Sequence, residues 1–190
     1  MTPRLEPVPK EQWDDDCAAA VRAGMPAAAA DRFLSPAPDA PRLANGITSL
    51  LHHPKLAAKF LGFNGQLLWE PLLEPRMREL AVLRVAHRTA SSYEWAQHVK
   101  LSQRYDVTAA EVEAIASDDF GVFTDLEAAV LHATDQLLDD YRVDDETWET
   151  LAGALDARTL VEFLFVVGTY TSLAMVFNGI GIELDPEEQR

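Results

Sequence analysis

The sequence has a single cysteine, Cys17, among its 190 residues. One thiol can form neither an internal disulfide nor a Cys-x-x-Cys redox pair. Basic residues are also scarce: 16 Lys and Arg stand against 31 Asp and Glu, which gives a formal net charge of −15. Because this charge repels phosphate backbones and anionic lipid surfaces, we expect neither nucleic acid nor a membrane as a partner.

The sequence also has little that indicates export or membrane insertion. The first sixteen residues are rich in proline and acids and lack the apolar run of a signal peptide. The one long apolar stretch, residues 160–177, contains Glu162, which is costly in lipid. We therefore expect a soluble, cytoplasmic protein. A single small helical domain covers so apolar a helix poorly, which favours a homo-oligomer.

Helix signals recur along the chain and strand signals are nearly absent, so we expect an all-α fold. The length fits one compact domain that needs no disulfide or metal to hold its core. We expect an N-terminal extension over residues 1–42, with one helix and a proline-rich loop, and a helical domain over residues 43–190. The predicted helices are Lys10–Ala23, Leu43–His52, Pro54–Glu70, Pro75–Ala90, Ser92–Tyr105, Thr108–Ala116, Thr124–Asp140, Asp144–Leu155 and Asp156–Asn178.

One predicted helix carries a carboxylate and an imidazole on the same face. Glu94 and His98 lie four residues apart, and Ser91, seven residues before His98, extends the same stripe. A carboxylate one turn from an imidazole can fix its tautomer and raise its basicity, as a general base requires. The alternative is a solvent-exposed pair, which stabilises a helix by only about 0.3–0.5 kcal/mol.

The preceding helix adds a second acid. Glu79 stands within an otherwise apolar pattern, near Arg76, Arg78 and Arg84. It is either a third member of the acid–base set or the partner of one of these arginines in a salt bridge.

Three segments of this region are similar to a known family. Arg78-Glu79-Leu80, Arg84-Val85-Ala86 and Tyr93-Glu94-Trp95-x-x-His98 resemble the carboxymuconolactone decarboxylase family, which includes the alkylhydroperoxidase D proteins. The resemblance extends from about Leu43 to Leu184. It implies the compact multi-helix fold of that family and a homo-oligomeric assembly.

The peroxidase branch of the family has the pattern Glu, eleven residues, Cys-x-x-Cys, three residues, His. This spacing places the glutamate at Glu79 and the histidine at His98, and puts Ser91 and Glu94 at the two cysteine positions. Neither side chain can attack a peroxide as a thiolate or resolve the product as a second thiol. Thiol peroxidase activity is therefore disfavoured.

The lactone decarboxylase branch lacks the cysteine pair and keeps Glu-x-x-x-His. The resemblance then implies acid–base chemistry without a cofactor on a small carboxylated or lactone substrate. His98 would move the proton, and Glu79 or Glu94 would orient it or serve as a buried acid. Arg84 is a candidate anchor for a substrate carboxylate, and Tyr93 and Tyr170 are candidates for the pocket wall.

Two other functions remain open at this point. Two carboxylates and an imidazole could bind a divalent metal, although the resemblance calls for none. The chain could also be a non-catalytic ligand-binding or assembly protein that keeps the scaffold. The sequence does not choose between decarboxylation, isomerisation and hydrolysis, because all three need the same proton-moving groups.

Overall fold

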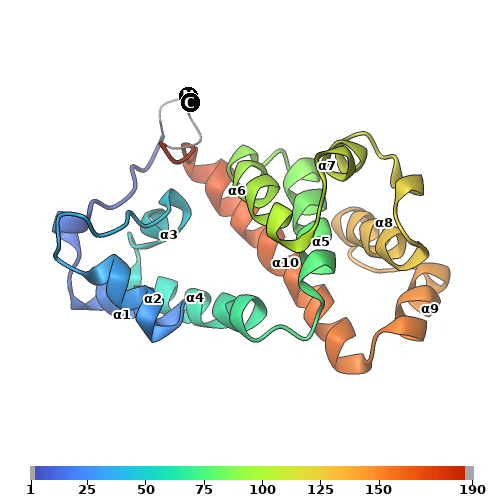
Figure 1. The fold of residues 1–190 in the computed structure, drawn as a ribbon, viewed down its shortest axis with the longest axis horizontal. Coiled ribbons are helices and arrows are strands. Elements are labelled where there is room, and N and C mark those ends of the chain that lie inside the picture. Colours follow the sequence, from blue (N-terminus) through green and yellow to red (C-terminus); the bar gives the residue numbers. More distant parts are fainter. Residues whose placement is uncertain (1–2, 187–190) are drawn as a thin grey trace. The chain divides into compact units, whose positions relative to one another are not determined.

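The computed structural model describes residues 3–186, which form α-helices and three short 3-10 helices and contain no strand (Figure 1). The all-α prediction is confirmed. In chain order the elements are η1 (Lys10–Gln12), α1 (Asp15–Ala23), α2 (Ala27–Leu34), α3 (Asn45–Leu50), α4 (Pro54–Trp69), α5 (Pro75–Arg88), α6 (Ser92–Ser102), η2 (Gln103–Tyr105), α7 (Ala109–Ala116), η3 (Phe120–Val122), α8 (Asp125–Asp140), α9 (Asp145–Ala154) and α10 (Ala157–Ile180).

The first helix is shorter than predicted. Asp14 accepts a hydrogen bond from the backbone N–H of Cys17 at 2.8 Å and so caps α1, which begins at Asp15 instead of Lys10. The proline-rich loop expected within residues 1–42 contains a second helix, the eight-residue α2. The predicted helix over Ser92–Tyr105 ends at Ser102 and continues as the 3-10 turn η2.

The described residues fall into two compact units. One comprises the residues up to Pro71 together with those from Gly179 onward, and the other comprises Leu72–Asn178. The division between these units lies after Pro71, and within the first unit α4 packs against α1. A Cβ atom at Gly65 would lie 3.3 Å from the carbonyl oxygen of Gly24, so glycine permits the close approach of these two helices.

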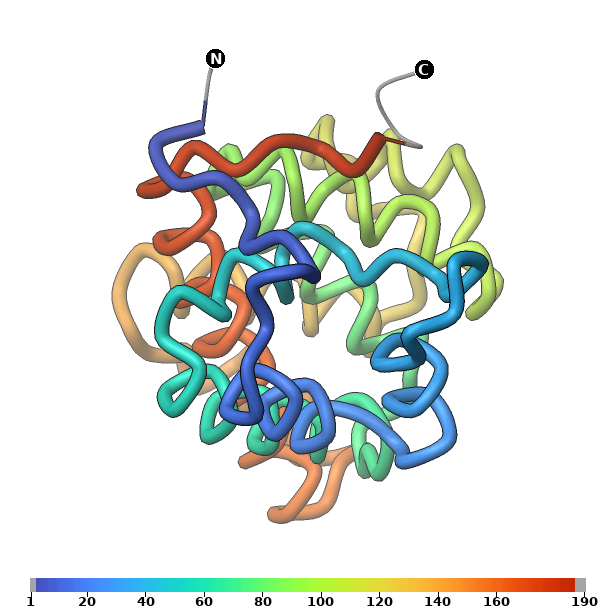
Figure 2. Tube along the Cα trace, turned by 90° about the vertical axis from the view of Figure 1, so that its left-hand side faces the viewer, coloured from blue at the N-terminus to red at the C-terminus, as the bar shows by residue number. Residues whose placement is uncertain are grey.

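Within the first unit the two ends of the described chain lie side by side (Figure 2). The backbone N–H of Arg4 donates to the carbonyl of Ile180 at 2.7 Å. Asp185 accepts hydrogen bonds from the backbone of Asn45 and from the side chain of Arg42. These bonds hold the segment after α10 against the start of α3.

In the second unit, α7 and α8 begin with the same kind of N-terminal cap. Thr108 and Glu111 form a capping box at the start of α7, and Thr124 and Glu127 form another at the start of α8, as the sequence predicts. In each box the threonine hydroxyl accepts the N–H three residues on, and the glutamate accepts the N–H of the threonine.

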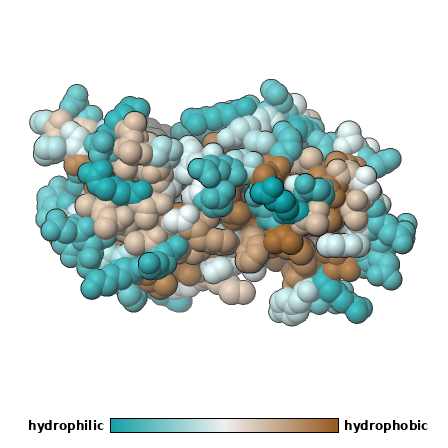
Figure 3. Space-filling model, turned by 90° about the horizontal axis from the view of Figure 1, so that it is seen from below, coloured by the Kyte–Doolittle hydropathy of each residue, from teal (hydrophilic) through white to brown (hydrophobic). Residues whose placement is uncertain are grey.

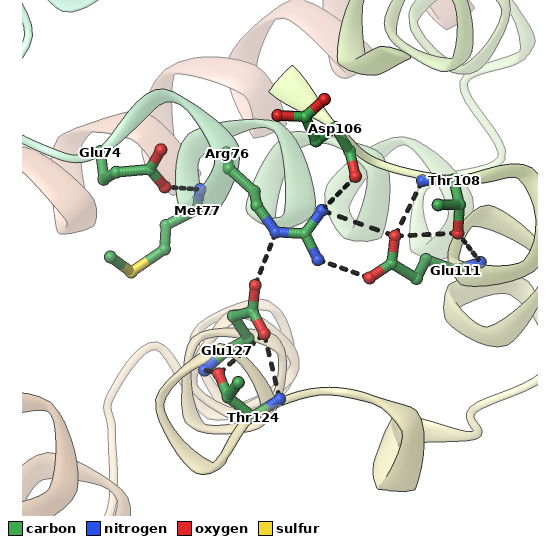
Figure 4. Close-up of polar contacts among 8 residues, drawn as sticks. All are labelled: Glu74, Arg76, Met77, Asp106, Thr108, Glu111, Thr124 and Glu127. Carbon is green, nitrogen blue, oxygen red and sulfur yellow. Dashed lines mark hydrogen bonds and ion pairs between the residues drawn. The ribbon is translucent and has the colours of Figure 1, made fainter. Parts of the chain in front are cut away.

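Arg76 connects these two capping boxes to α5 (Figure 4). Its guanidinium donates to Glu111 at 2.5 Å, to Glu127 at 2.7 Å and to the carbonyl of Asp106 at 2.7 Å. Because one side chain contacts three separate segments, it fixes where α7 and α8 start relative to the first turn of α5. The core beneath contains Leu80, Leu83, Val107, Ile115, Phe120 and Leu131.

α10 is the one helix in residues 3–186 that is long and apolar enough to cross a membrane by length and composition alone. More than half of its apolar window is buried, as in the core helix of a soluble protein. Its Glu162 accepts the backbone N–H groups of Leu72 and Leu73 at 2.7 and 2.8 Å, so this buried carboxylate has partners. The side chains of α10 that stay exposed include Val161, Phe165, Met175 and Val176.

Apolar side chains also reach the surface elsewhere. Figure 3 draws one face of the molecule, on which hydrophobic residues gather between hydrophilic ones.

Candidate active site

A tight link between α5 and α6 sets the position of the candidate site. Ala90 has φ of 52°, the left-handed conformation that usually requires glycine at the end of a helix. The next N–H, that of Ser91, donates to the carbonyl of Ala86 at 2.9 Å. The chain therefore reverses within three residues, and α6 starts at Ser92 directly beside the helix that carries Glu79.

The polar stripe of α6 faces the interior. Ser91, Glu94 and His98 are respectively 1, 2 and 8% exposed, and Glu79 of α5 is fully buried. The structure thus brings Glu79 and His98 together and places Ser91 and Glu94 on the same buried face of α6. The alternative of a solvent-exposed Glu94–His98 pair is wrong, because both side chains are buried.

His98 and Glu79 are joined by a hydrogen bond. The Nδ1 atom of His98 lies 2.7 Å from Oε2 of Glu79. Because an ionised carboxylate can only accept, Nδ1 carries the hydrogen, and in the neutral ring Nε2 holds the free lone pair. Among the described residues no hydrogen bond to Nε2 is observed.

The other carboxylate oxygen of Glu79 accepts hydrogen bonds from Arg78. The Nε and Nη2 atoms of Arg78 donate to Oε1 at 3.1 and 3.0 Å. Burial raises the pKa of Glu79, but the hydrogen bond and charge of His98 and the charge of Arg78 outweigh burial and bring the pKa below its usual value. Glu79 is therefore ionised at neutral pH. Its carboxylate forms the expected salt bridge with Arg78 and also the expected contact with His98.

Glu94 is in a different electrical environment from Glu79. Neither of its carboxyl oxygens has a hydrogen-bond partner, and the same holds for the Ser91 hydroxyl one turn away. Burial raises the pKa of Glu94 to about 7, against the lowering effects of the nearby Ser91 hydroxyl and of His98. At neutral pH this side chain consequently spends much of its time as the protonated acid.

Aromatic rings of α10 lie against side chains of α6. The ring of Tyr170 meets the imidazole of His98 edge-on, with centroids 5.1 Å apart. Tyr93 packs edge-on against Phe177 at 5.3 Å. Burial raises the pKa of Tyr170 strongly, so its phenol stays protonated beside the imidazole. Sequence reasoning did not single out Tyr105, whose ring lies 5.4 Å from the guanidinium carbon of Arg78.

Arg84, the expected carboxylate anchor, faces away from this region. It donates to both oxygens of Asp135 at 2.6 and 2.7 Å and to the carbonyl of Ile115 at 2.8 Å, and it pairs with Asp118. All these partners lie on or beside α7 and α8. Arg84 therefore ties helices together, and the cation next to the candidate site is Arg78.

The segment that carries the candidate site is similar to a known protein family. Residues 54–136, which contain α5, α6 and α7, match the model of the carboxymuconolactone decarboxylase family. This segment is therefore similar to the carboxymuconolactone decarboxylase family. The match includes Glu79, Ser91, Glu94 and His98. No curated protein matches this sequence.

Solved structures of similar fold extend the likeness to most of the chain. The apo debrominase Bmp8 has a TM-score of 0.71 with 15% identity and covers 97% of this chain and 94% of its own. The alkylhydroperoxidase AhpD core of an uncharacterized peroxidase-related protein from Ralstonia eutropha has a TM-score of 0.71, 16% identity, and coverage of 87% and 90%. A protein of unknown function from Agrobacterium tumefaciens has a TM-score of 0.65, 17% identity, and coverage of 72% and 94%. At such identities the likeness establishes the fold.

The geometry supports neither thiol chemistry nor a bound metal ion. Cys17 lies buried in α1 of the first unit, and burial raises the pKa of its thiol, which opposes the thiolate form. Within residues 3–186 no three His, Cys, Asp or Glu side chains are grouped to hold a metal ion. Glu79 in particular gives its oxygens to Arg78 and His98.

Proposed function

We propose that this protein is a member of the carboxymuconolactone decarboxylase family and an acid–base enzyme that works without a cofactor on a small carboxylated or lactone substrate. The observation that carries the proposal is the buried hydrogen bond between Glu79 and His98. It holds the imidazole in one orientation and one tautomer, with Nε2 free. Orientation of this kind is what distinguishes a catalytic imidazole from a surface histidine.

In the proposed reaction Nε2 of His98 takes or returns a proton at a substrate carbon. When the neutral ring takes a proton it becomes an imidazolium, and the adjacent carboxylate of Glu79 stabilises that charge through Nδ1–H. For a decarboxylation the C–C bond breaks, CO2 leaves, and the electron pair stays on the substrate as an enolate. A proton from the protonated ring of His98 then completes the product, and the ring regains a proton from water.

Arg78 supports this cycle by keeping Glu79 ionised. A buried carboxylate with no cation beside it would take up the proton itself and lose its ability to orient the ring. With Arg78 on Oε1 and His98 on Oε2, both oxygens are occupied and the carboxylate has little freedom to rotate.

The cysteine positions separate this proposal from a peroxidase. Ser91 and Glu94 occupy them, and a hydroxyl and a carboxyl cannot cycle between thiol and disulfide. The peroxidase-related and debrominase neighbours therefore support the scaffold and not their own reactions for this chain.

The test is turnover of carboxymuconolactone, followed as released CO2, with deuterium incorporation from heavy water into the product and into related lactones. We expect His98→Gln to lower the rate by about 10²–10⁴-fold, the usual contribution of a positioned acid or base. His132→Gln is the matched control, because His132 is an exposed histidine of α8 that packs on Phe120. Equal exchange and turnover in the wild-type protein and in His98→Gln would exclude His98 as the proton carrier.

A further inference from the structure

The second unit contains three copies of one local pattern, and one copy behaves differently. A serine or threonine followed three residues later by glutamate begins each of α6, α7 and α8. The pattern is a capping box, in which the two side chains satisfy backbone N–H groups of the first helical turn. The threonines of α7 and α8 do so, whereas Ser91 makes no capping hydrogen bond and Glu94 makes no return bond.

Backbone conformation accounts for the difference. Thr108 and Thr124 both have ψ of 160°, the extended conformation of an ordinary N-cap. Ser91 has ψ of 87°, and it follows Ala90 in the left-handed region. The tight α5–α6 link thus gives Ser91 a backbone conformation in which its hydroxyl does not cap α6. The left-handed Ala90 carries strain that a glycine at that position would avoid.

The two side chains are buried as well as uncapped. The Ser91 hydroxyl and both Glu94 oxygens are inaccessible and have no hydrogen-bond partner among the described residues. A buried polar group without a partner destabilises the folded protein, so few such groups persist in native structures. Here three of them lie within one helical turn, while the same residue types form ordinary caps at two other helix starts of the same unit.

We infer that Ser91 and Glu94 together form a two-donor site for one substrate oxygen that gains negative charge, the carbonyl oxygen of a lactone or oxo acid. The inference rests on the proposed function, because it assigns the groups that stabilise the enolate which His98 creates or consumes. Each side chain contributes one O–H, that of Ser91 and that of protonated Glu94. The substrate class is accordingly a carbonyl compound that can form an enolate.

The electrostatics of the position favour this assignment. Burial raises the pKa of Glu94 to about 7, which keeps a proton on the carboxyl group and makes it a donor. Ser91 is the N-cap residue and Glu94 lies in the first turn of an eleven-residue helix, where the helix dipole stabilises negative charge. Donors fixed in a buried site before the charge develops stabilise an oxyanion more than water does.

Protons and charge balance in the proposed step. When His98 removes a proton from the carbon next to the carbonyl, or when CO2 leaves that carbon, the electron pair delocalises onto the carbonyl oxygen. The O–H groups of Ser91 and Glu94 donate hydrogen bonds to that oxygen and keep their protons. When the protonated ring of His98 returns a proton to the carbon, the charge on the oxygen is neutralised, the ring becomes neutral and both donors are unchanged.

Stability measurements separate a ligand-binding pair from a cap. Thr108→Ala and Thr124→Ala remove capping hydrogen bonds and should lower the urea midpoint. Ser91→Ala should leave the midpoint unchanged or raise it, because it removes a buried hydroxyl that has no partner. A fall in Ser91→Ala as large as that in Thr108→Ala would overturn the inference, whatever the protein catalyses.

Binding of 4-nitrophenol at pH 6 tests the oxyanion site directly, since the absorbance of this probe reports hydrogen bonding to its oxygen. We expect saturable binding to the wild-type protein, at least tenfold weaker binding to Ser91→Ala and Glu94→Leu, and retained binding to Glu94→Gln, whose amide still donates. Absent binding to the wild-type protein, or equal binding to all variants, would overturn the inference.

The same probe distinguishes the two proposals. His98→Gln should keep 4-nitrophenol binding while losing turnover. If His98→Gln keeps both the probe and the turnover, the proposed function fails and the oxygen site stands. If turnover depends on His98 while the probe binds equally to Ser91→Ala, Glu94→Leu and the wild-type protein, the oxygen site fails and the proposed function stands.

Discussion

Oε2 of Glu79 lies 2.7 Å from Nδ1 of His98, although the two residues are 19 positions apart and belong to different helices. Arg78 holds the other oxygen of the same carboxylate. The pKa values of two neighbouring glutamates are consequently shifted in opposite directions. That of Glu79 is lowered, and that of Glu94 is raised to about 7. Such a separation between nearby carboxyl groups is typical of sites that move protons.

Glu94 should make the protein less stable as the pH rises. Its pKa is about 7 in the folded protein and 4.5 as a model value, so between these pH values the folded state binds more protons at this group than the unfolded state does. Stability due to Glu94 is fully present below pH 4.5 and is lost as the pH rises through 7. The loss amounts to about 3 kcal/mol.

Urea unfolding of the wild-type protein and of Glu94→Gln at pH 5 and pH 8 measures this effect. The difference between the two free energies of unfolding should shift by about 3 kcal/mol in favour of Glu94→Gln on going to pH 8. Parallel pH dependence of the two proteins would mean that Glu94 is solvated in solution.

Glu79 and Arg78 should be strongly coupled. Glu79→Gln leaves a buried guanidinium without its counter-ion and should cost about 3–5 kcal/mol of unfolding free energy. Arg78→Met combined with Glu79→Gln removes both charges and should recover most of that loss. A double-mutant cycle of urea unfolding gives the coupling energy, and additive losses would show that the two side chains do not interact in solution.

Much of this site could be predicted from the sequence, because helical spacing alone aligns Ser91, Glu94 and His98. The spacing could not reveal that Ser91 and Glu94 avoid a capping box, since this depends on the backbone of Ala90 and Ser91. The role of Arg84 depends on Asp135, which lies 51 residues away and is brought close only by the packing of α5 on α8.

The sequence likewise predicted some helix ends and missed others. Helix ends set by local chemistry, such as the threonine caps of α7 and α8, were predicted correctly. The start of α1 was not, because the side chain of Asp14 caps the helix there, and the residues from Lys10 to Gln12 form a separate 3-10 turn.

We expect the protein to form a homo-oligomer through the apolar face of α10. Val161, Met175 and Val176 are exposed on this helix. Val161→Asp with Met175→Asp should dissociate the assembly, because a charge in an apolar interface loses its solvation. Light scattering should give a multiple of 21.0 kDa for the wild-type protein and for the control Leu56→Asp, which alters an exposed leucine of α4. A mass of 21.0 kDa for the wild-type protein would contradict the prediction.

The most direct test of the account is the tautomer of His98. Nitrogen-15 NMR of histidine-labelled protein, with the His98 signals assigned by their loss in His98→Gln, distinguishes a protonated ring nitrogen from an unprotonated one. At a pH where the ring is neutral, we predict that Nδ1 carries the hydrogen and Nε2 does not, because ionised Glu79 accepts from Nδ1. A ring protonated at Nε2, or one that exchanges between the two tautomers, would contradict the claim that Glu79 prepares His98 as the base.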